Sequence, residues 1–158
     1  MSTDDLKLIQ LRRMKESDVA YIYDTWMEDY LSAHYVKMKS TDKYPIQTWV
    51  ALMPRELYYK EQRARIDKIL KKSIVMVACN QEDEDQIFGY IVYRSISEHL
   101  DLVSAVYVRH VYRNFGICGL LFKHMGNADI VTHCSPKRRW LLKRYNLIFN
   151  PFMEEIDD

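Results

Sequence analysis

The chain has 158 residues and a mass of 19.0 kDa; 48% of its residues are hydrophobic and 28% are charged. These values are typical of one soluble globular domain and exclude a disordered chain, which would have few apolar residues and a high net charge. With 23 basic and 22 acidic residues, the formal net charge is +1, which excludes a histone-like polybasic protein. We expect one domain over residues 1–158.

We expect neither a secretory signal nor a membrane-spanning segment. The beginning of the chain, Met1 to Asp5, is polar and acidic, unlike a secretory signal. The longest uncharged stretch, Tyr44 to Pro54, is too short for a bilayer, which requires about 20 apolar residues. The three cysteines form no Cys-x-x-Cys pair, and the five histidines are dispersed. We therefore expect a cytoplasmic protein with reduced thiols, no membrane partner and no metal site.

The first half of the chain predicts one strand and two helices. Residues 6–14 favour a strand, although their apolar alternation is broken once. A helix is expected from Val19 to Tyr30, because apolar residues recur there at steps of three and four. Residues 31–53 have no clear period, and residues 54–70 predict a second helix that begins at a proline.

The second half alternates between strands and helices. Continuous runs of strand-forming residues predict strands at 73–79, 87–93 and 100–108. An acidic turn joins the first two of these strands, which therefore should form an antiparallel hairpin. The remaining expected elements are a helix at 116–125, a strand at 130–134, a helix at 136–144 and an edge strand at 147–152. The order β-α-α-β-β-β-α-β-α-β predicts an α/β fold with a mixed sheet and helices on its faces.

A short basic loop links the strand at 100–108 to the helix that opens at Gly116. The first amides of a helix have no internal partners and carry a partial positive charge, so they can hold phosphate. Gly116 would let a ligand approach the backbone, and Arg109 and Arg113 add formal charge. An ordinary basic turn is the alternative interpretation.

This stretch resembles the acetyl-CoA signature of the GCN5-related N-acetyltransferase (GNAT) superfamily, Arg/Gln-x-x-Gly-x-Gly/Ala. Here it reads Arg113-Asn114-Phe115-Gly116-Ile117-Cys118, preceded by the strand end Tyr107-Val108. The order of elements from Leu8 to Phe152 is also similar to that of the family. Cys118 departs from the Gly or Ala of the motif.

The resemblance implies a GNAT-like fold in which the fourth and fifth strands splay and the pantetheine arm of acetyl-CoA lies in the gap. It implies direct transfer of an acetyl group to an amine acceptor, either a protein or a small molecule. Alignment of the last helix with the family places Ser135 and Arg138 at cofactor-facing positions. The residues implied to bind acetyl-CoA are Val106, Val108, Arg113, Asn114, Phe115, Gly116, Ile117, Cys118, Gly119, Ser135 and Arg138.

Transfer to an amine also requires a proton acceptor and a proton donor for the leaving thiolate. The first candidate for the acceptor is Asp101, near the usual family position, although a turn-forming Asp is equally consistent. The family's tyrosine position holds Leu142, so Tyr145 would be the donor only if the helix is shifted; otherwise it is a core aromatic. Glu28 and Asp29 would attract a cationic amine.

Two other functions stay open. Cys118 and Leu142 favour a non-catalytic GNAT-like module that binds coenzyme A or a protein partner. The basic helix from Pro136 to Arg144 would suit a nucleic-acid accessory protein, but a net charge near zero argues against a broad nucleic-acid footprint. The oligomeric state is not determined by the sequence, and a homodimer stays open.

Overall fold

The computed structural model describes residues 8–38, 54–134 and 138–155. Its strands are β1 (Ile9–Arg13), β2 (Ile74–Asn80), β3 (Ile87–Ser97), β4 (Leu100–Val108), β5 (Ile130–Val131) and β6 (Ile148–Phe149). Its α-helices are α1 (Val19–Met38), α3 (Arg55–Lys71), α4 (Ile117–Met125) and α5 (Trp140–Arg144). Short 3-10 helices cover Glu16–Asp18, His110–Tyr112 and Pro151–Glu155.

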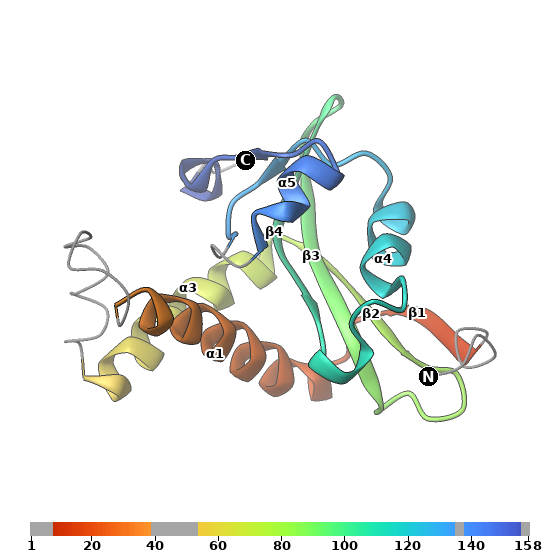
Figure 1. Cartoon of the computed structure of the whole chain (residues 1–158), viewed down its shortest axis with the longest axis horizontal. Helices are drawn as coiled ribbons and strands as arrows, with labels where there is room; N and C mark the ends of the chain where they lie inside the picture. Colours follow the sequence, from red (N-terminus) through yellow and green to blue (C-terminus); the bar gives the residue numbers. More distant parts are fainter. Residues whose placement is uncertain (1–7, 39–53, 135–137, 156–158) are drawn as a thin grey trace.

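The strands form one six-stranded sheet in the order of the chain, β1-β2-β3-β4-β5-β6. Figure 1 labels β1 to β4 of this sheet and the four α-helices. Neighbours from β1 to β4 are antiparallel, whereas β5 and β6 are added in parallel. The predicted mixed sheet, the predicted hairpin and the predicted order of strands and helices are therefore confirmed.

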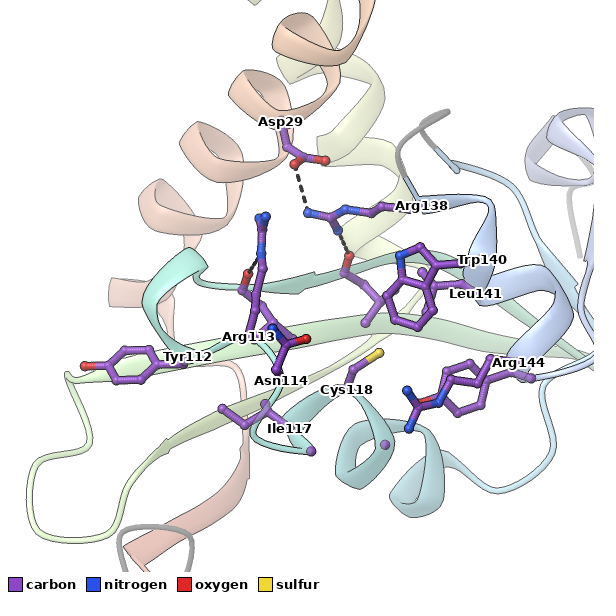
Figure 2. A pocket seen from close by; sticks show the side chains of 15 residues that line it. Asp29, Tyr112, Arg113, Asn114, Ile117, Cys118, Arg138, Trp140, Leu141 and Arg144 are labelled. Carbon is purple, nitrogen blue, oxygen red and sulfur yellow. Dashed lines mark hydrogen bonds and ion pairs between the residues drawn. The ribbon is translucent and has the colours of Figure 1, made fainter. Parts of the chain in front are cut away.

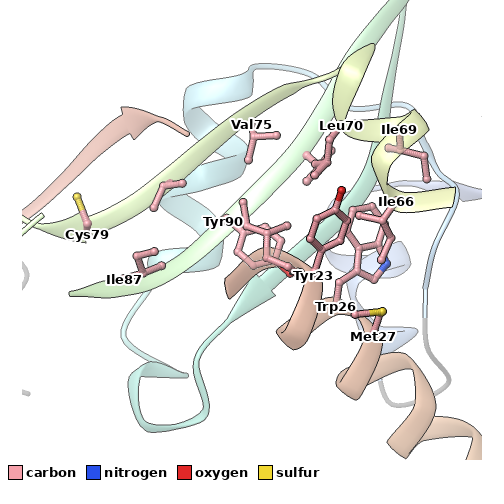
Figure 3. Close-up of a cluster of buried hydrophobic side chains, with 14 residues drawn as sticks. Tyr23, Trp26, Met27, Ile66, Ile69, Leu70, Val75, Cys79, Ile87 and Tyr90 are labelled. Atoms are coloured by element: carbon pink, nitrogen blue, oxygen red, sulfur yellow. The ribbon is translucent and has the colours of Figure 1, made fainter. Parts of the chain in front are cut away.

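Helices α1 and α3 cover one face of the sheet (Figure 3). The apolar side chains of α1, such as Ile22 and Trp26, recur at helical spacing and meet Ile66 of α3 over the strands. Tyr90 of β3 lies at the centre of this cluster and is 1% exposed. The first helix is longer than expected, because it continues to Met38.

Helices α4 and α5 cover the opposite face. Ile117 and Leu121 of α4 are fully buried against the strands, together with Leu141 of α5. Burying an apolar side chain of this size contributes about 1.5–3 kcal/mol. This packing holds the start of α4 against the end of β4, where the candidate site lies.

The last two strands are shorter than predicted. The expected strand at 130–134 pairs only over Ile130–Val131, because β4 and β5 diverge beyond that point. The expected strand at 147–152 is likewise wrong beyond Phe149. Pro151 has no N–H for a strand ladder, and the Asn150 side chain accepts the N–H of Phe152 at 3.1 Å, which favours the 3-10 turn instead.

The last helix also starts later than predicted. The expected start at Pro136 lies outside the described residues, and α5 begins at Trp140. Arg138, just before it, is held by side-chain bonds to β4 and α1. In the part of the chain that the structure describes, no helix is both long and apolar enough to cross a membrane.

Candidate active site

The sheet opens between β4 and β5. Pairing ends at Val103 and Val131, and one further bond joins the Thr132 N–H to the Val103 carbonyl at 3.0 Å. On the other side of β4, the register passes from Val103 to Ala105, so Ser104 is the extra residue of a bulge. Beyond the bulge, β4 continues to Val108 without pairing to β5. The gap that the family resemblance implies is therefore present.

A buried carboxylate lies where the two strands part. Glu154 is 6% exposed, and its Oε2 accepts bonds from the Ser104 hydroxyl at 2.7 Å and the Thr132 hydroxyl at 2.6 Å. Ser104 belongs to the β4 bulge and Thr132 follows β5 directly. Because one oxygen binds both strands, the C-terminal 3-10 helix fixes how they diverge.

A cavity of about 630 Å³ lies beside the gap (Figure 2). Its walls come from the end of β4, the loop after it, the first turn of α4, and helix α5. The predicted cofactor residues that line it are Val106, Val108, Arg113, Asn114, Gly116, Ile117, Cys118, Gly119 and Arg138. The structure thus brings residues of the acetyl-CoA signature together with Arg138, which the alignment of the last helix placed toward the cofactor.

The loop before α4 has an unusual backbone. Asn114 and Gly116 have φ values of 70° and 82°, in the left-handed region that glycine adopts most easily. Gly116 is the N-cap of α4. Because it has no side chain, it cannot accept a hydrogen bond from the first N–H groups of the helix. The first amides of α4 therefore border the cavity at the positive end of a helix, a suitable place for phosphate oxygens.

The side chains around the cavity are mainly cationic. Arg113, Arg138 and Arg144 line it, and Asp29 of α1 is the acidic residue among the described lining residues. The Arg144 guanidinium lies 5.9 Å from the centre of the Trp140 ring and 5.7 Å from that of Tyr145. A concave site with this excess of positive charge attracts anionic ligands.

Two arginines cover carbonyls on the unpaired part of β4 (Figure 2). Arg113 donates from Nε to the Val108 carbonyl at 3.0 Å, and Arg138 donates to the Val106 carbonyl. Arg138 also forms an ion pair of 2.8 Å with Asp29. Because β5 is absent here, these guanidinium groups provide the hydrogen bonds that a neighbouring strand would otherwise make.

Tyr145 lies directly after α5 and lines the cavity, three residues beyond the position that the alignment expects. Its ring stacks on Phe122 at 4.0 Å, and its hydroxyl lies over the first turn of α4, 3.6 Å from where a Cβ on Gly119 would be. Burial, together with the neighbouring Cys118 thiol, raises the pKa of Tyr145 to about 12. The phenol is therefore protonated at neutral pH.

Cys118 lies in the same first turn of α4, close to Tyr145. Burial raises the pKa of its thiol, while a hydrogen bond with the Tyr145 hydroxyl acts in the opposite direction. The side chain is thus a neutral thiol at pH 7 and adds no negative charge to the cavity.

Three predicted residues lie elsewhere. Asp101 is at the far end of β4, where it accepts a hydrogen bond from the Ser95 hydroxyl, and the structure does not bring it to the cavity. Phe115 is half-buried beside the cavity but is not part of its lining. Ser135 lies outside the described residues.

Two aromatic residues of the lining were not predicted from the sequence. Tyr112 directly precedes the motif arginine, and its hydroxyl accepts a bond from the Gln86 side chain at 3.0 Å. Trp140 is half exposed in the structure, and a large exposed aromatic often marks a binding surface; the signal in the sequence is a single tryptophan within the basic segment that ends at Arg144. Among the described residues, no group of three or more His, Cys, Asp or Glu side chains is placed to hold a metal ion.

No protein-family model and no curated protein matches the sequence. Solved structures do match the fold. A possible acetyltransferase from Clostridium difficile 630 is similar over 90% of this chain and 91% of its own, at 17% identity and a TM-score of 0.54. YycN from Bacillus subtilis, likewise described as a possible acetyltransferase, is similar over 95% of this chain and 92% of its own, at 13% identity and a TM-score of 0.56. The chain therefore has the mixed α/β fold of the GNAT acetyltransferases.

Proposed function

We propose that this chain is a single-domain N-acetyltransferase that uses acetyl-CoA to acetylate a primary amine of a protein or small molecule. One observation carries the proposal: the unpaired end of β4 and the uncapped start of α4 meet in one cavity lined by arginines. A strand edge suits the amide groups of a pantetheine arm, and a helix start suits a pyrophosphate.

The cavity residues have distinct roles in this proposal. When bound, acetyl-CoA supplies an acetyl group activated as a thioester. The amides from Asn114 to Gly119 hold the pyrophosphate, and backbone groups of Val106 and Val108 pair with the pantetheine arm. A backbone amide near Val108 polarises the thioester carbonyl.

Proton transfer in the proposed reaction needs a donor and an acceptor. Tyr145 is the proposed donor to the leaving thiolate, supported by its place on the cavity wall and its raised pKa of about 12. Asp101 stays the acceptor predicted from the sequence, but its distance along β4 from the cavity does not support this role.

Two measurements on the full chain test the proposal. Calorimetric titration with acetyl-CoA should give micromolar binding, and a thiol assay should detect coenzyme A released in the presence of a mixture of primary amines. A folded chain that does not bind acetyl-CoA would refute the proposal. Tight binding without thiol release from any amine would instead support the non-catalytic module, which Cys118 in the motif favours.

A further inference from the structure

A second, smaller cavity lies on the other side of the β4 edge. It measures about 30 Å³, and its walls are mainly aromatic: Trp26, Tyr90, Tyr107 and His133. The Tyr90 and Tyr107 rings stack at 5.5 Å, and Trp26 meets His133 edge to face at 5.5 Å. Asp29, Val106 and Arg138 line both this cavity and the larger one.

The side chain of Arg138 lies where the two cavities meet. One guanidinium nitrogen is 2.8 Å from the Asp29 carboxylate, and another donates to the Val106 carbonyl (Figure 2). Its central carbon is 5.6 Å from the centre of the Tyr107 ring. The protein thus shows a cation seated between a carboxylate, a carbonyl and an aromatic face, all groups that favour positive charge.

The Val106 carbonyl links this cation to the cofactor. It lies on the unpaired part of β4, where the proposed function places the pantetheine arm. A cofactor amide and Arg138 would therefore compete for the same acceptor. A guanidinium that loses this bond keeps only the Asp29 carboxylate and the Tyr107 ring as partners, so cofactor binding makes it easier for Arg138 to leave Asp29.

We infer that Arg138 occupies the cation position of the acceptor site until the cofactor binds. The small aromatic cavity, enlarged by the space that the guanidinium leaves, is then the acceptor subsite, and Asp29 is the residue that binds the positively charged amine of the acceptor. This inference rests on the proposed function and extends it: the acceptor is a cation, and its binding depends on the displacement of Arg138. Aromatic walls that exclude water strengthen the attraction between Asp29 and an ammonium group.

The test uses butylammonium, whose length is similar to that of the arginine side chain, and the neutral analogue butanol. Each is titrated into the full chain without coenzyme A, and the indole N–H signal of Trp26 is followed by NMR, with Trp26→Phe for its assignment. We expect Arg138→Ala to bind butylammonium about tenfold more tightly than the native chain, because the internal cation is gone. Adding Asp29→Asn should abolish this gain, and butanol should show none.

Lys143→Ala is the matched control, since Lys143 is an exposed cation of α5 outside both cavities and its removal should leave butylammonium binding unchanged. The Arg138–Asp29 pair is partly exposed, so its loss should cost little stability, which a thermal melt checks. Should Arg138→Ala not fold, Arg138→Gln carries the same test. The inference is overturned if removing the guanidinium gives no gain, or if the gain survives Asp29→Asn.

Coenzyme A provides the second measurement. At saturation it should tighten butylammonium binding to the native chain but not to Arg138→Ala, in which nothing is left to displace. If coenzyme A tightened butylammonium binding equally in both proteins, the inference that the cofactor displaces Arg138 would be overturned. The two proposals fail in different measurements. A folded chain that does not bind coenzyme A refutes the proposed function. An Arg138→Ala variant that binds butylammonium no more tightly than the native chain, in the titrations without coenzyme A, refutes the acceptor subsite.

Discussion

Two walls of the larger cavity can be compared, the motif wall (residues 113–119) and the helix wall (residues 138–145). The motif wall presents mainly backbone, shaped by the left-handed conformation of Asn114 and Gly116 at the start of α4. The helix wall presents side chains, including Arg138 and Tyr145, which depend on contacts with other elements. One wall is built by local conformation and the other by tertiary packing.

The difference affects how each wall can be recognised. A backbone site needs few specific residues, so a short motif in the right strand-helix context is enough to find it. On the helix wall, Tyr145 is placed by stacking on Phe122, and Arg138 by Asp29, which is 109 positions away. The alignment with the family placed Arg138 near the cofactor, but no short pattern records the contacts that hold these two side chains, and variants of the two walls should therefore differ in their effects.

The largest effect is expected on the motif wall, at Gly116. Gly116→Trp places a side chain at φ 82° and an indole over the amides of α4, and coenzyme A affinity measured by calorimetry should fall about 100-fold. Gly126→Trp is the control, because Gly126 also has a positive φ and open space but lies at the other end of α4. Equal losses of affinity in both variants would show that strain, not a blocked site, is the cause.

The second effect concerns the helix wall. Tyr145→Phe should lower kcat about 30-fold with little change in KM, because the proposed proton donor is lost but the ring remains. Since the pKa of Tyr145 is raised to about 12, its ionisation should not reduce native kcat between pH 7 and pH 10. Tyr112→Phe, on the other side of the cavity, should retain kcat. A similar decrease in both variants would argue against a specific role of Tyr145.

A labelling experiment compares thiols on and off the motif wall. Alkylation of Cys118 by iodoacetamide should be slow at pH 7 and speed up with rising pH, because burial raises its pKa and only the thiolate reacts. Saturating coenzyme A should slow it about tenfold further by covering the cavity. Cys134, whose pKa burial also raises, does not line the cavity and should be unaffected by coenzyme A. Mass spectrometry measures alkylation at each cysteine separately. If coenzyme A slowed alkylation of Cys118 and Cys134 equally, the cause would be a general decrease in the mobility of the protein and not coverage of the cavity.

The smallest effect is expected at Arg113. Arg113→Ala should weaken coenzyme A binding only about threefold, since the side chain is exposed and its charge is screened by salt. Its present bond to the Val108 carbonyl must also be given up when the cofactor binds, which offsets part of its attraction. Arg139→Ala, an exposed arginine outside the lining, is the control. Calorimetry at two salt concentrations should show a smaller salt dependence for Arg113→Ala alone.

Most of the fold could be predicted, because β2, β3 and β4 are continuous runs of strand-forming residues and α1 and α3 carry apolar stripes. The errors are concentrated in the last 30 residues. There the strands have two residues each, too short for any period to be visible. The end of β5 is set by hydrogen bonds to the distant Glu154, whereas β6 ends at the local turn of Asn150 and Pro151.

The sequence by itself determined the order of elements and the loop that leads into α4, because both follow from the conformational preferences of neighbouring residues. Only the tertiary structure decided that β4 and β5 part after Val103, that Tyr145 reaches the cavity, and that Arg138 pairs with Asp29. These features depend on contacts between residues far apart in the chain. Local preferences do not encode such contacts, which form only when the helices pack on the sheet.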